Sequence, residues 1–378
     1  MTSEGLVEIV FLRGLSDLVE ALSPLDEKAR RRLSKTALEL NRGLVRGGKI
    51  PIPSHLLEPV KEVLAGASPL NPPPASTTAA LAVLGTGSLS QARRVEVFLW
   101  KPEQEDALMQ ILRDRRPPWM ELWIEHSLDH GKSVFGWRAL RAWIRHGVCR
   151  KPRSDGYVQL MVRDLSQWRD ESSPPLSRRL LDDPELLDDE VWRLFKVATR
   201  AFNDEVESNP YAPSDVESWA GALVRLAGEG RLDRQRLLDA SLSALTRGFH
   251  STGLSGFHKL HLRLKPTVEE LEARQVVYRG LLTIPVGHVV DFALKMLGRL
   301  ERAHKLDVAP CLDELEPVFE LAVKGPALRA LRLVRRVAGR HSELRPRAQA
   351  QQIWRCGPAT MPRPSAGVPR PDDRDCFR

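Results

Sequence analysis

Apolar residues recur at helical spacing along nearly every segment of this chain that is not rich in proline, while runs of alternating β-branched residues are scarce. A period near 3.6 residues places apolar side chains on one face of a helix, whereas a half-buried strand needs a period of two. Proline or glycine stands at most junctions between the periodic segments, where either residue ends a helix. The pattern therefore predicts an all-α chain.

Loops of only a few residues join the longer periodic segments, so successive helices are expected to lie antiparallel and side by side. Stacked helix pairs of this kind form an α-solenoid, with about 40 residues per repeat in the HEAT and armadillo classes. No strict internal repeat is visible, so we predict a degenerate HEAT-like solenoid. The expected helices are Leu6–Leu22, Leu25–Val45 (with Ser23 as N-cap and Pro24 at the first helical position), Ser54–Leu64, Gln91–Leu99, Pro102–Arg113, Pro118–Leu128, Phe135–His146, Tyr157–Trp168, Glu185–Phe202, Asp215–Ala227, Asp233–Thr246, Leu254–Leu264, Val268–Leu282, Val286–Ala303, Leu312–Ala322 and Ala327–Ala338.

Composition divides the chain into five expected regions. The three successive prolines that begin at Pro72 favour polyproline II and indicate a linker. After Arg340 the composition turns to arginine, proline, alanine and glycine, so we expect a disordered tail; a frameshift or premature ending in a GC-rich gene is one hypothesis for its origin. The regions are an N-terminal helical segment (1–65), a Pro-rich linker (66–88), a Trp-rich helical array (89–172), a HEAT-like helical array (173–340) and the tail (341–378).

Eight of the nine tryptophans lie in the middle of the chain. Trp119 and Trp123, or Trp137 and Ile144, have the spacing of residues on one helix face. We expect these rings to pack in the core, with an aromatic ligand-binding groove as the alternative. The eight are Trp100, Trp119, Trp123, Trp137, Trp143, Trp168, Trp192 and Trp219.

Five short stretches carry a resemblance to a known family. The chain resembles an uncharacterised family of HEAT-like helical proteins from high-GC bacteria, over about residues 90–340. The resemblance implies a helical-repeat fold, and it implies no activity or catalytic residues, since none is established for that family. The stretches are Arg116–Trp119, Lys151–Tyr157, Gly230–Leu242, Phe257–His261 and Leu264–Glu270.

The net charge of +8 is concentrated at one end of the chain. Residues 325–378 hold 12 lysines and arginines against 4 aspartates and glutamates, whereas residues 1–324 hold 45 of each kind. A basic excess suggests nucleic acid as a partner only where the basic residues gather on one surface. Composition therefore supports such a partner only near the C-terminal end.

Four arginines lie on one face of the last expected helix: Arg329, Arg332, Arg336 and Arg340. We expect the opposite face to pack on a neighbouring helix, so that the arginines point outward as a candidate binding site. Such a stripe could bind phosphates, with an affinity that falls as salt rises; a solvated face and an acidic protein partner are the alternatives. The expected packing face holds Leu328, Leu331, Val334 and Ala338.

Motifs for catalysis are missing from the sequence. It contains no G-x-x-x-x-G-K-[ST] phosphate loop, no G-x-S-x-G nucleophile elbow and no H-E-x-x-H zinc motif. We therefore expect neither an enzyme nor a cofactor. The carboxylates of Asp182–Glu185 and Asp188–Glu190 are interpreted as groups at a helix start, where they interact favourably with the positive end of the helix dipole.

Histidine and cysteine residues offer two weak metal-like groups. The first contains His126, His130, His146 and Cys149, whose imidazoles and thiol are suitable zinc ligands but whose spacing is loose. The second contains His250, His258 and His261, with no acidic or thiol companion at matched spacing. We interpret both groups as surface or helix-terminal histidines and predict no metal site.

The leading hypothesis is a non-enzymatic helical-repeat scaffold that binds a protein partner. The alternative is a nucleic-acid-binding HEAT-like module that uses the arginine stripe, and a third is a base-removing glycosylase on a HEAT-like frame. No apolar run reaches the roughly 18–20 residues that cross a bilayer, and the N-terminus lacks the basic start of a signal peptide, so we expect a cytoplasmic protein with no membrane partner. Because the four cysteines have no short paired spacing, the sequence suggests neither a disulfide framework nor a zinc ribbon. The oligomeric state is left open.

Overall fold

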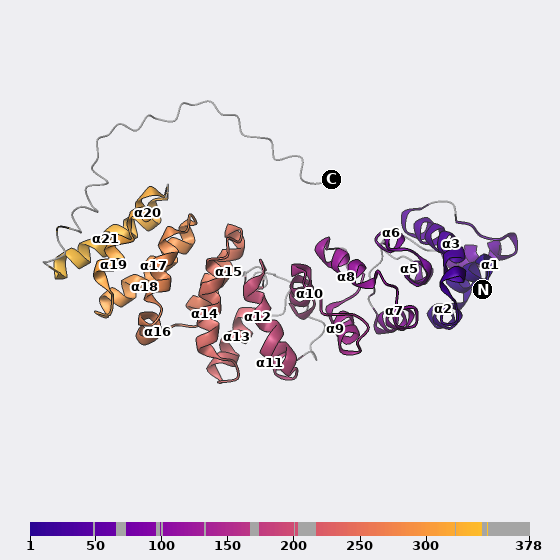
Figure 1. Cartoon of the computed structure of the whole chain (residues 1–378), viewed down its shortest axis with the longest axis horizontal. Coiled ribbons are helices and arrows are strands. Elements are labelled where there is room, and N and C mark those ends of the chain that lie inside the picture. The colour runs from indigo at the N-terminus through magenta and orange to yellow at the C-terminus, as the bar shows by residue number, and fades with distance from the viewer. Residues whose placement is uncertain are drawn as a thin grey trace, which may run out of the picture. The chain divides into compact units, whose positions relative to one another are not determined.

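The computed structural model of the chain consists of helices (Figure 1). It describes residues 1–47, 50–65, 73–95, 99, 101–131, 134–166, 174–199, 201–202, 217–321, 323–341 and 346. Within these residues every regular element is a helix and no strand occurs, which confirms the all-α prediction. Of the predicted tail, only residues 341 and 346 are among them.

Contacts divide the chain into two compact units, Met1–Ala240 and Ser241–Arg378. The predicted linker and the expected boundary at residue 173 do not coincide with this division. The first unit contains α1 (Ser3–Glu8), a π-helix (Ile9–Arg13), α2 (Leu15–Leu22), α3 (Glu27–Arg46), a 3-10 helix (Ser54–Leu56), α4 (Leu57–Leu64), α5 (Pro74–Thr86), α6 (Leu89–Ala92), α7 (Pro102–Arg115), α8 (Met120–Asp129), α9 (Trp137–Arg145), α10 (Asp155–Ser166), α11 (Leu176–Leu181), a π-helix (Leu186–Glu190), α12 (Val191–Arg193), a 3-10 helix (Leu194–Lys196) and α13 (Trp219–Gly228). The division falls within α14 (Arg234–Leu245).

The second unit continues from α14 with seven further α-helices among its described residues. They are α15 (Ser251–Arg263), α16 (Val268–Glu272), α17 (Gln275–Gly280), α18 (Gly287–Arg302), α19 (Val308–Asp313), α20 (Glu316–Glu320) and α21 (Lys324–Arg340), with a 3-10 helix at Leu281–Thr283. Several predicted helices are therefore split. Val268–Leu282, for example, becomes α16, α17 and the 3-10 helix.

The N-terminal helices begin and end differently from the prediction. The expected helix Leu6–Leu22 is interrupted at Gly14, whose φ of 104° is a conformation that side-chain-bearing residues rarely adopt. The next helix begins after Asp26, whose carboxylate accepts a hydrogen bond of 2.7 Å from the Ala29 amide. The predicted cap at Ser23 was therefore wrong, because Asp26 satisfies the free amides of the first turn instead.

The predicted Pro-rich linker contains a buried helix. Residues 74–86 of the expected linker 66–88 form α5, which packs against α3 and α7. Pro74 occupies the first helical position, where its missing N–H costs nothing, and the alanines that follow favour a helix. The linker prediction was wrong for these residues because the proline run starts a helix; residues 66–72 lie outside the described residues.

One buried arginine ties α5 to its neighbours. The Arg30 guanidinium donates hydrogen bonds to the carbonyl oxygens of Leu22 (2.7 Å), Leu25 (2.9 Å) and Gly85 (2.8 Å). The carbonyls of Leu22 and Gly85 lie at the ends of α2 and α5, where helical acceptors have no partner within the helix, and that of Leu25 lies in the loop between α2 and α3. Arg30 therefore replaces water at two buried helix ends.

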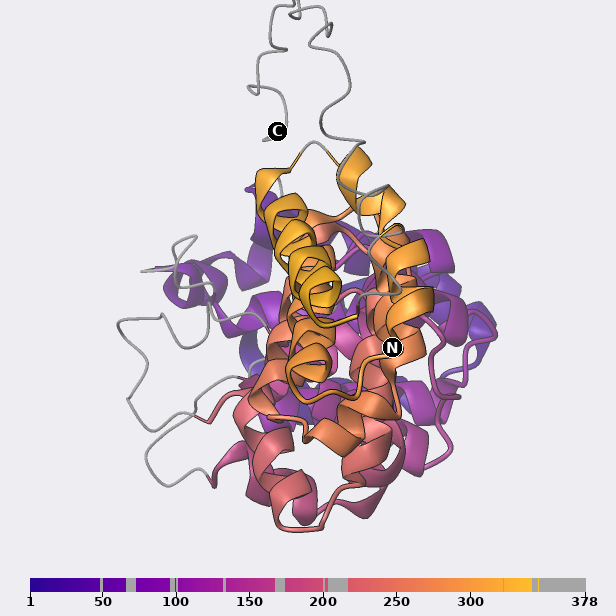
Figure 2. The same ribbon diagram turned by 90° about the vertical axis from the view of Figure 1, so that its left-hand side faces the viewer.

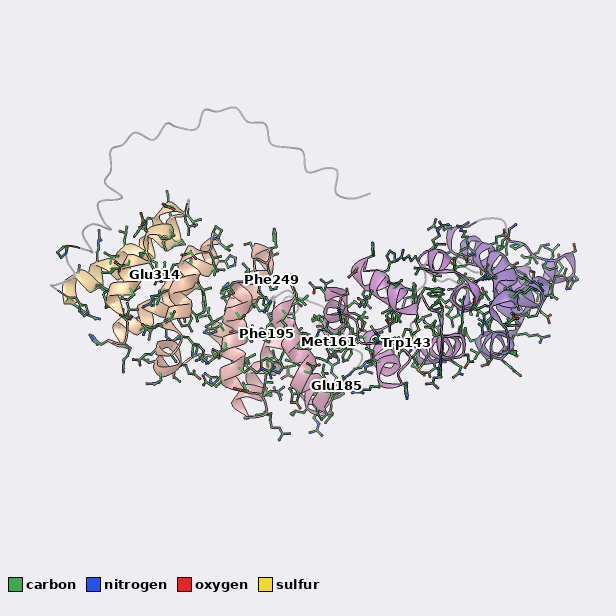
Figure 3. The ribbon with its side chains drawn as sticks, viewed as in Figure 1. Trp143, Met161, Glu185, Phe195, Phe249 and Glu314 are labelled. Atoms are coloured by element: carbon green, nitrogen blue, oxygen red, sulfur yellow. The ribbon has the colours of Figure 1, made fainter. Side chains whose placement is uncertain are left out.

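The described tryptophans of the first unit belong mainly to the core. Trp123, Trp143 and Trp219 are almost fully buried, and Trp143 is labelled in Figure 3. Phe135 lies between two of them, with ring centroids 5.5 Å from Trp123 and 4.9 Å from Trp143. The core prediction is confirmed for these rings and for Trp137 and Trp192. Trp119 is half-buried beneath Arg115, while Trp100 and Trp168 lie outside the described residues.

Helix α18 is the centre of the second unit, whose helices are drawn orange to yellow in Figure 2. It contacts α15, α16 and α17, and its most extensive contact is with α21. A buried chain of hydrogen bonds adds to this core: His261 Nδ1 lies 2.8 Å from Ser241 Oγ, and His261 Nε2 lies 2.7 Å from Tyr278 Oη. The pairing of α18 with α21 also creates a groove.

Across the described residues, no helix combines the length and the apolar character that a membrane span requires.

Candidate anion-binding groove

A groove of about 420 Å³ lies where α18 and α21 meet, with one residue of α15 at its side. Six of its lining side chains are cationic, and none of its lining residues is acidic. The cations are Lys295, Arg299, Arg302, Arg329, Arg332 and Arg336, and the other lining residues are Leu262, Leu294, Met296 and Gly298. The groove therefore joins a cationic surface to a small apolar one.

The two helices that form the groove carry most of the local charge. Together, α18 and α21 hold nine lysines and arginines against two acidic residues, Asp291 and Glu301. The apolar face of each helix is buried, so the charged side chains gather along the margins of the helix pair. A strongly positive potential is expected there.

The buried face of α21 differs from the predicted one. It holds Ala327, Ala330, Val334 and Val337, whereas Leu328 is 45 % exposed. Of the predicted face, Val334 is buried as expected. The buried face as a whole is displaced from the predicted one by about one residue, which corresponds to a rotation of about 100° around the helix. This rotation turns part of the arginine stripe toward α18 and away from open solvent.

Asp291 of α18 holds two of the cations at one end of the groove. Its carboxylate accepts a hydrogen bond of 2.6 Å from Arg329 Nε and lies 3.1 Å from Lys295 Nζ. Burial alone would raise the pKa of Asp291, but the hydrogen bonds from Arg329 and Lys295 outweigh it and hold that pKa below its ordinary value. Asp291 therefore stays ionised and fixes the positions of both cations.

Glu301 holds a second pair of cations at the other end of α18. Its side chain is only 4 % exposed, and its two oxygens each lie 2.6 Å from an arginine nitrogen, Nε of Arg336 and Nη1 of Arg340. Arg329 contacts Asp291, and Arg336, further along α21, contacts Glu301, further along α18. The two helices therefore run in the same direction. Three of the four predicted arginines are therefore bound to α18.

Two arginines of the groove remain open. Arg302 and Arg332 are exposed, and the side chain of neither forms a hydrogen bond or ion pair with any residue that the structure describes. Arg299 donates to the Pro266 carbonyl oxygen at 2.8 Å. Open guanidinium groups beside fixed cations can bind an oxyanion through charge-assisted hydrogen bonds.

The sequence pattern predicted only the α21 half of this site. Lys295, Arg299 and Arg302 follow one another at four- and three-residue spacing on α18, which is the same signal that marked the stripe on α21. They were missed because α18 and α21 are separated in the sequence by α19 and α20.

The first metal-like group is not assembled into a site. The rings of His126 and His130 lie against each other at an angle of 39°, with centroids 4.0 Å apart, and His130 Nδ1 lies 2.8 Å from the His126 carbonyl oxygen. Burial, with a smaller effect from Glu121, raises the pKa of the Cys149 thiol to about 12, whereas a zinc ligand must be a thiolate. In the described part of the chain no three histidine, cysteine or acidic residues are placed to hold a metal.

The second histidine group is spread over different environments. His250 is exposed beside Thr252, while His261 takes part in the buried chain with Ser241 and Tyr278. His258 faces His288 of α18 instead, with ring centroids 5.2 Å apart. Burial, together with repulsion from His288, lowers the pKa of His258 to about 4.

The acidic clusters form ion pairs within the first unit. Asp183 and Glu185 bind Arg141 and Arg145 of α9, and Glu185 is labelled in Figure 3. Glu190, which is nearly fully buried, lies beside the Tyr157 hydroxyl and Lys151 Nζ, each at 2.9 Å. These carboxylates therefore join helices, in addition to any effect on the helix start.

Comparison with known proteins assigns the chain to a family. No curated protein and no solved structure matches the chain. A family described as a domain of unknown function, DUF6493, matches residues 77–323, which is more than half of the chain and reaches from within α5 past the end of α20. This match agrees with the expectation of an uncharacterised family. The chain therefore belongs to the DUF6493 family.

Proposed function

We propose that this chain is a non-enzymatic, degenerate HEAT-like scaffold whose α18–α21 groove binds an acidic segment of a protein partner. The observation that carries the proposal is the lining of the groove, with six cationic side chains and no acidic one. The parallel run of α18 and α21 supports the repeat architecture, because equivalent helices of successive repeats in a solenoid point the same way. The family resemblance and the cysteine usage support the cytoplasm of a bacterium as its location.

The lining of the groove favours a peptide over a nucleic acid. None of its lining residues is aromatic, so the bases of a single strand would find no stacking surface there. A duplex typically covers about 1,000 Å² or more of protein surface, which extends well beyond a small groove. A cavity of about 420 Å³ fits only a few side chains. The apolar side chains of Leu262, Leu294 and Met296 offer contacts to an aliphatic residue beside the acidic ones.

Nucleic acid remains the second candidate function because arginine outnumbers lysine in the groove by five to one. Guanidinium groups contact phosphates and bases in bidentate fashion. The arginines of α21 also lie outside the residues that match the family, so the family itself does not decide between the two candidates.

Binding of labelled peptides to the full-length chain tests the proposal. A fluorescent peptide that contains glutamate and leucine is titrated at several salt concentrations, beside a matched peptide with glutamine in place of glutamate. We expect only the acidic peptide to bind, with affinity falling as salt rises. Arg302→Gln and Arg332→Gln are each expected to weaken binding about tenfold.

The matched control is Arg335→Gln, because Arg335 is an exposed arginine of α21 that does not line the groove. Equal binding of the glutamine peptide, or equal losses in Arg335→Gln and Arg332→Gln, would contradict the proposal. Tighter binding of labelled single-stranded or duplex DNA, lost on Arg302→Gln or Arg332→Gln, would establish the nucleic-acid alternative instead.

A further inference from the structure

We propose that the acidic group recognised by the groove is a phosphomonoester on the partner, a phosphoserine or phosphothreonine, held between Arg302 and Arg332. The inference rests on the proposed function and names the chemical class of the ligand. It follows from how the cations of the groove are shared, from their fixed geometry and from the number of open donors.

The two carboxylates of the helix pair leave a positive excess. Asp291 is shared by Lys295 and Arg329, and Glu301 is shared by Arg336 and Arg340, so that each carboxylate balances only one of its two cations. The surplus is one positive charge in each cluster. Arg299, Arg302 and Arg332 add to it, since none of them contacts a carboxylate among the described residues.

This excess fits a phosphate better than a carboxylate. A carboxylate carries one charge and is satisfied by one guanidinium in bidentate geometry. A phosphomonoester carries a charge of about −1.5 to −2 at pH 7 and has three strong acceptor oxygens, so it needs more than one cation. Arg302 and Arg332 supply two open guanidinium groups from two different helices that line one cavity.

The neighbours of the open arginines are already in place. Along α21, Arg332 lies one turn from both Arg329 and Arg336, whose Nε atoms are each held 2.6 Å from a carboxylate oxygen of α18. On α18, Arg302 follows Arg299, which is held by the Pro266 carbonyl. Fixed cations add to the potential at the groove and lose little conformational entropy when a ligand binds.

The test compares three peptides of one sequence that carry serine, glutamate or phosphoserine at the central position. Each is titrated against the full-length chain at pH 7.5 by fluorescence anisotropy. We expect the phosphoserine peptide to bind at least about tenfold more tightly than the glutamate peptide. Arg302→Gln and Arg332→Gln should each weaken phosphoserine binding about a hundredfold, against about tenfold for the glutamate peptide, so that the preference for phosphoserine is lost. Arg335→Gln should change neither affinity.

Two further readouts distinguish a phosphate-specific site from general attraction. Arg332→Lys keeps the charge but loses the planar fork. Because the phosphate uses both guanidinium groups whereas Arg302 alone can hold a carboxylate, phosphoserine binding should weaken more than glutamate binding. The phosphate also loses charge near its second pKa of about 6, so phosphoserine binding should weaken between pH 7.5 and pH 5.5. The glutamate peptide should not weaken over this range, because its carboxylate stays ionised.

The outcomes separate this inference from the proposed function. Equal affinities for phosphoserine and glutamate, with both lost in Arg302→Gln, would overturn the phosphate inference and leave the acidic-peptide function standing. No binding of either peptide would overturn both. Tighter binding of inorganic phosphate or of vesicles that contain phosphoinositides, by the same two arginines, would show that the phosphate does not come from a protein and would also overturn the inference.

Discussion

Arg336 Nε lies 2.6 Å from Glu301 Oε2 and thereby links α21 to a carboxylate of α18 that is 4 % exposed. Arg340 binds the other oxygen of the same carboxylate. These two contacts show that α21 is held to α18 by charge as well as by its apolar face. It also means that two arginines of the predicted stripe have a structural role beside any role in binding.

We expect the double substitution Arg336→Gln/Arg340→Gln to destabilise the contact between α18 and α21. Glu301 would lose both cations while it stays buried, and breaking a buried ion pair by removing one side costs about 3–5 kcal/mol. The cost should lie toward the lower end, because both arginines are themselves about 40 % exposed. Hydrogen exchange of the α18 and α21 amides measures the effect as faster local opening.

Adding Glu301→Gln to this double variant supplies the control. The added substitution removes the unpaired charge, so protection of α18 and α21 should return in part. If the triple variant exchanges as fast as the double variant, the stability of the helix pair does not depend on the charge of Glu301.

Stability of the second unit should fall in mild acid because of His258 and His288. Burial lowers the pKa of both side chains in the folded chain, to about 4 for His258, whereas both titrate near 6.5 when unfolded. The unfolded chain therefore takes up protons first. The contribution of the neutral pair is complete above about pH 6.5 and declines as pH falls toward about 4. For His258, a pKa lowered from about 6.5 to about 4 corresponds to a loss of about 3 kcal/mol.

The positive neighbours of this pair act in the same direction, since Lys259 and Lys295 also lower the pKa of His258. Urea unfolding at pH 7.5 and pH 5.0 should show a smaller loss of stability for His258→Gln/His288→Gln than for the wild type. His250→Gln serves as the control, because His250 is exposed. A His258 side chain that titrates near pH 6.5 in an NMR experiment would contradict the prediction.

Gly156 of α10 lies against the backbone of α8. A Cβ atom at this position would overlap the Leu128 carbonyl oxygen, which cannot move without displacing the end of α8. We expect Gly156→Ala to cost about 1–3 kcal/mol. Unfolding in urea followed by tryptophan fluorescence measures this, since eight of the nine tryptophans belong to the first unit.

Gly228→Ala is the matched control for this substitution. Gly228 is also helical, but nothing lies within 4 Å of a Cβ atom built there. The added methyl group should be neutral or stabilise the helix by about 0.5 kcal/mol. Equal losses in the two variants would show that the contact with Leu128 does not limit the packing of α8 and α10.

The periodic pattern of the sequence was enough to predict helices but not their exact limits. Trp123, Trp143 and Trp219 were predicted to be buried because large apolar rings at helical spacing gain most from leaving water. Gly14 shows the limit of this reasoning, because a continuous apolar pattern runs through a residue whose backbone turns to φ of 104°. Such a break depends on what the flanking turns pack against.

In the segment from Pro74 to Thr86, the local signals conflict. Three prolines indicate an extended linker, while the alanines after them favour a helix. Burial decides between the two: eleven of the thirteen residues of α5 are buried, chiefly between α3 and α7. A helix that is apolar on all sides shows no amphipathic pattern, so the sequence offered no period from which to predict it.

The sequence by itself determined the helical fold, the burial of the central tryptophans and the concentration of positive charge near the C-terminal end, because these depend on local periodicity and composition. Only the tertiary structure decided that α21 packs on α18 and presents its arginines to Asp291 and Glu301. A rotation of one residue around α21 changes which side chains meet, and it depends on the shape of the facing helix. For that reason the groove, with Arg302 and Arg332 open inside it, became visible only when both helices were in place.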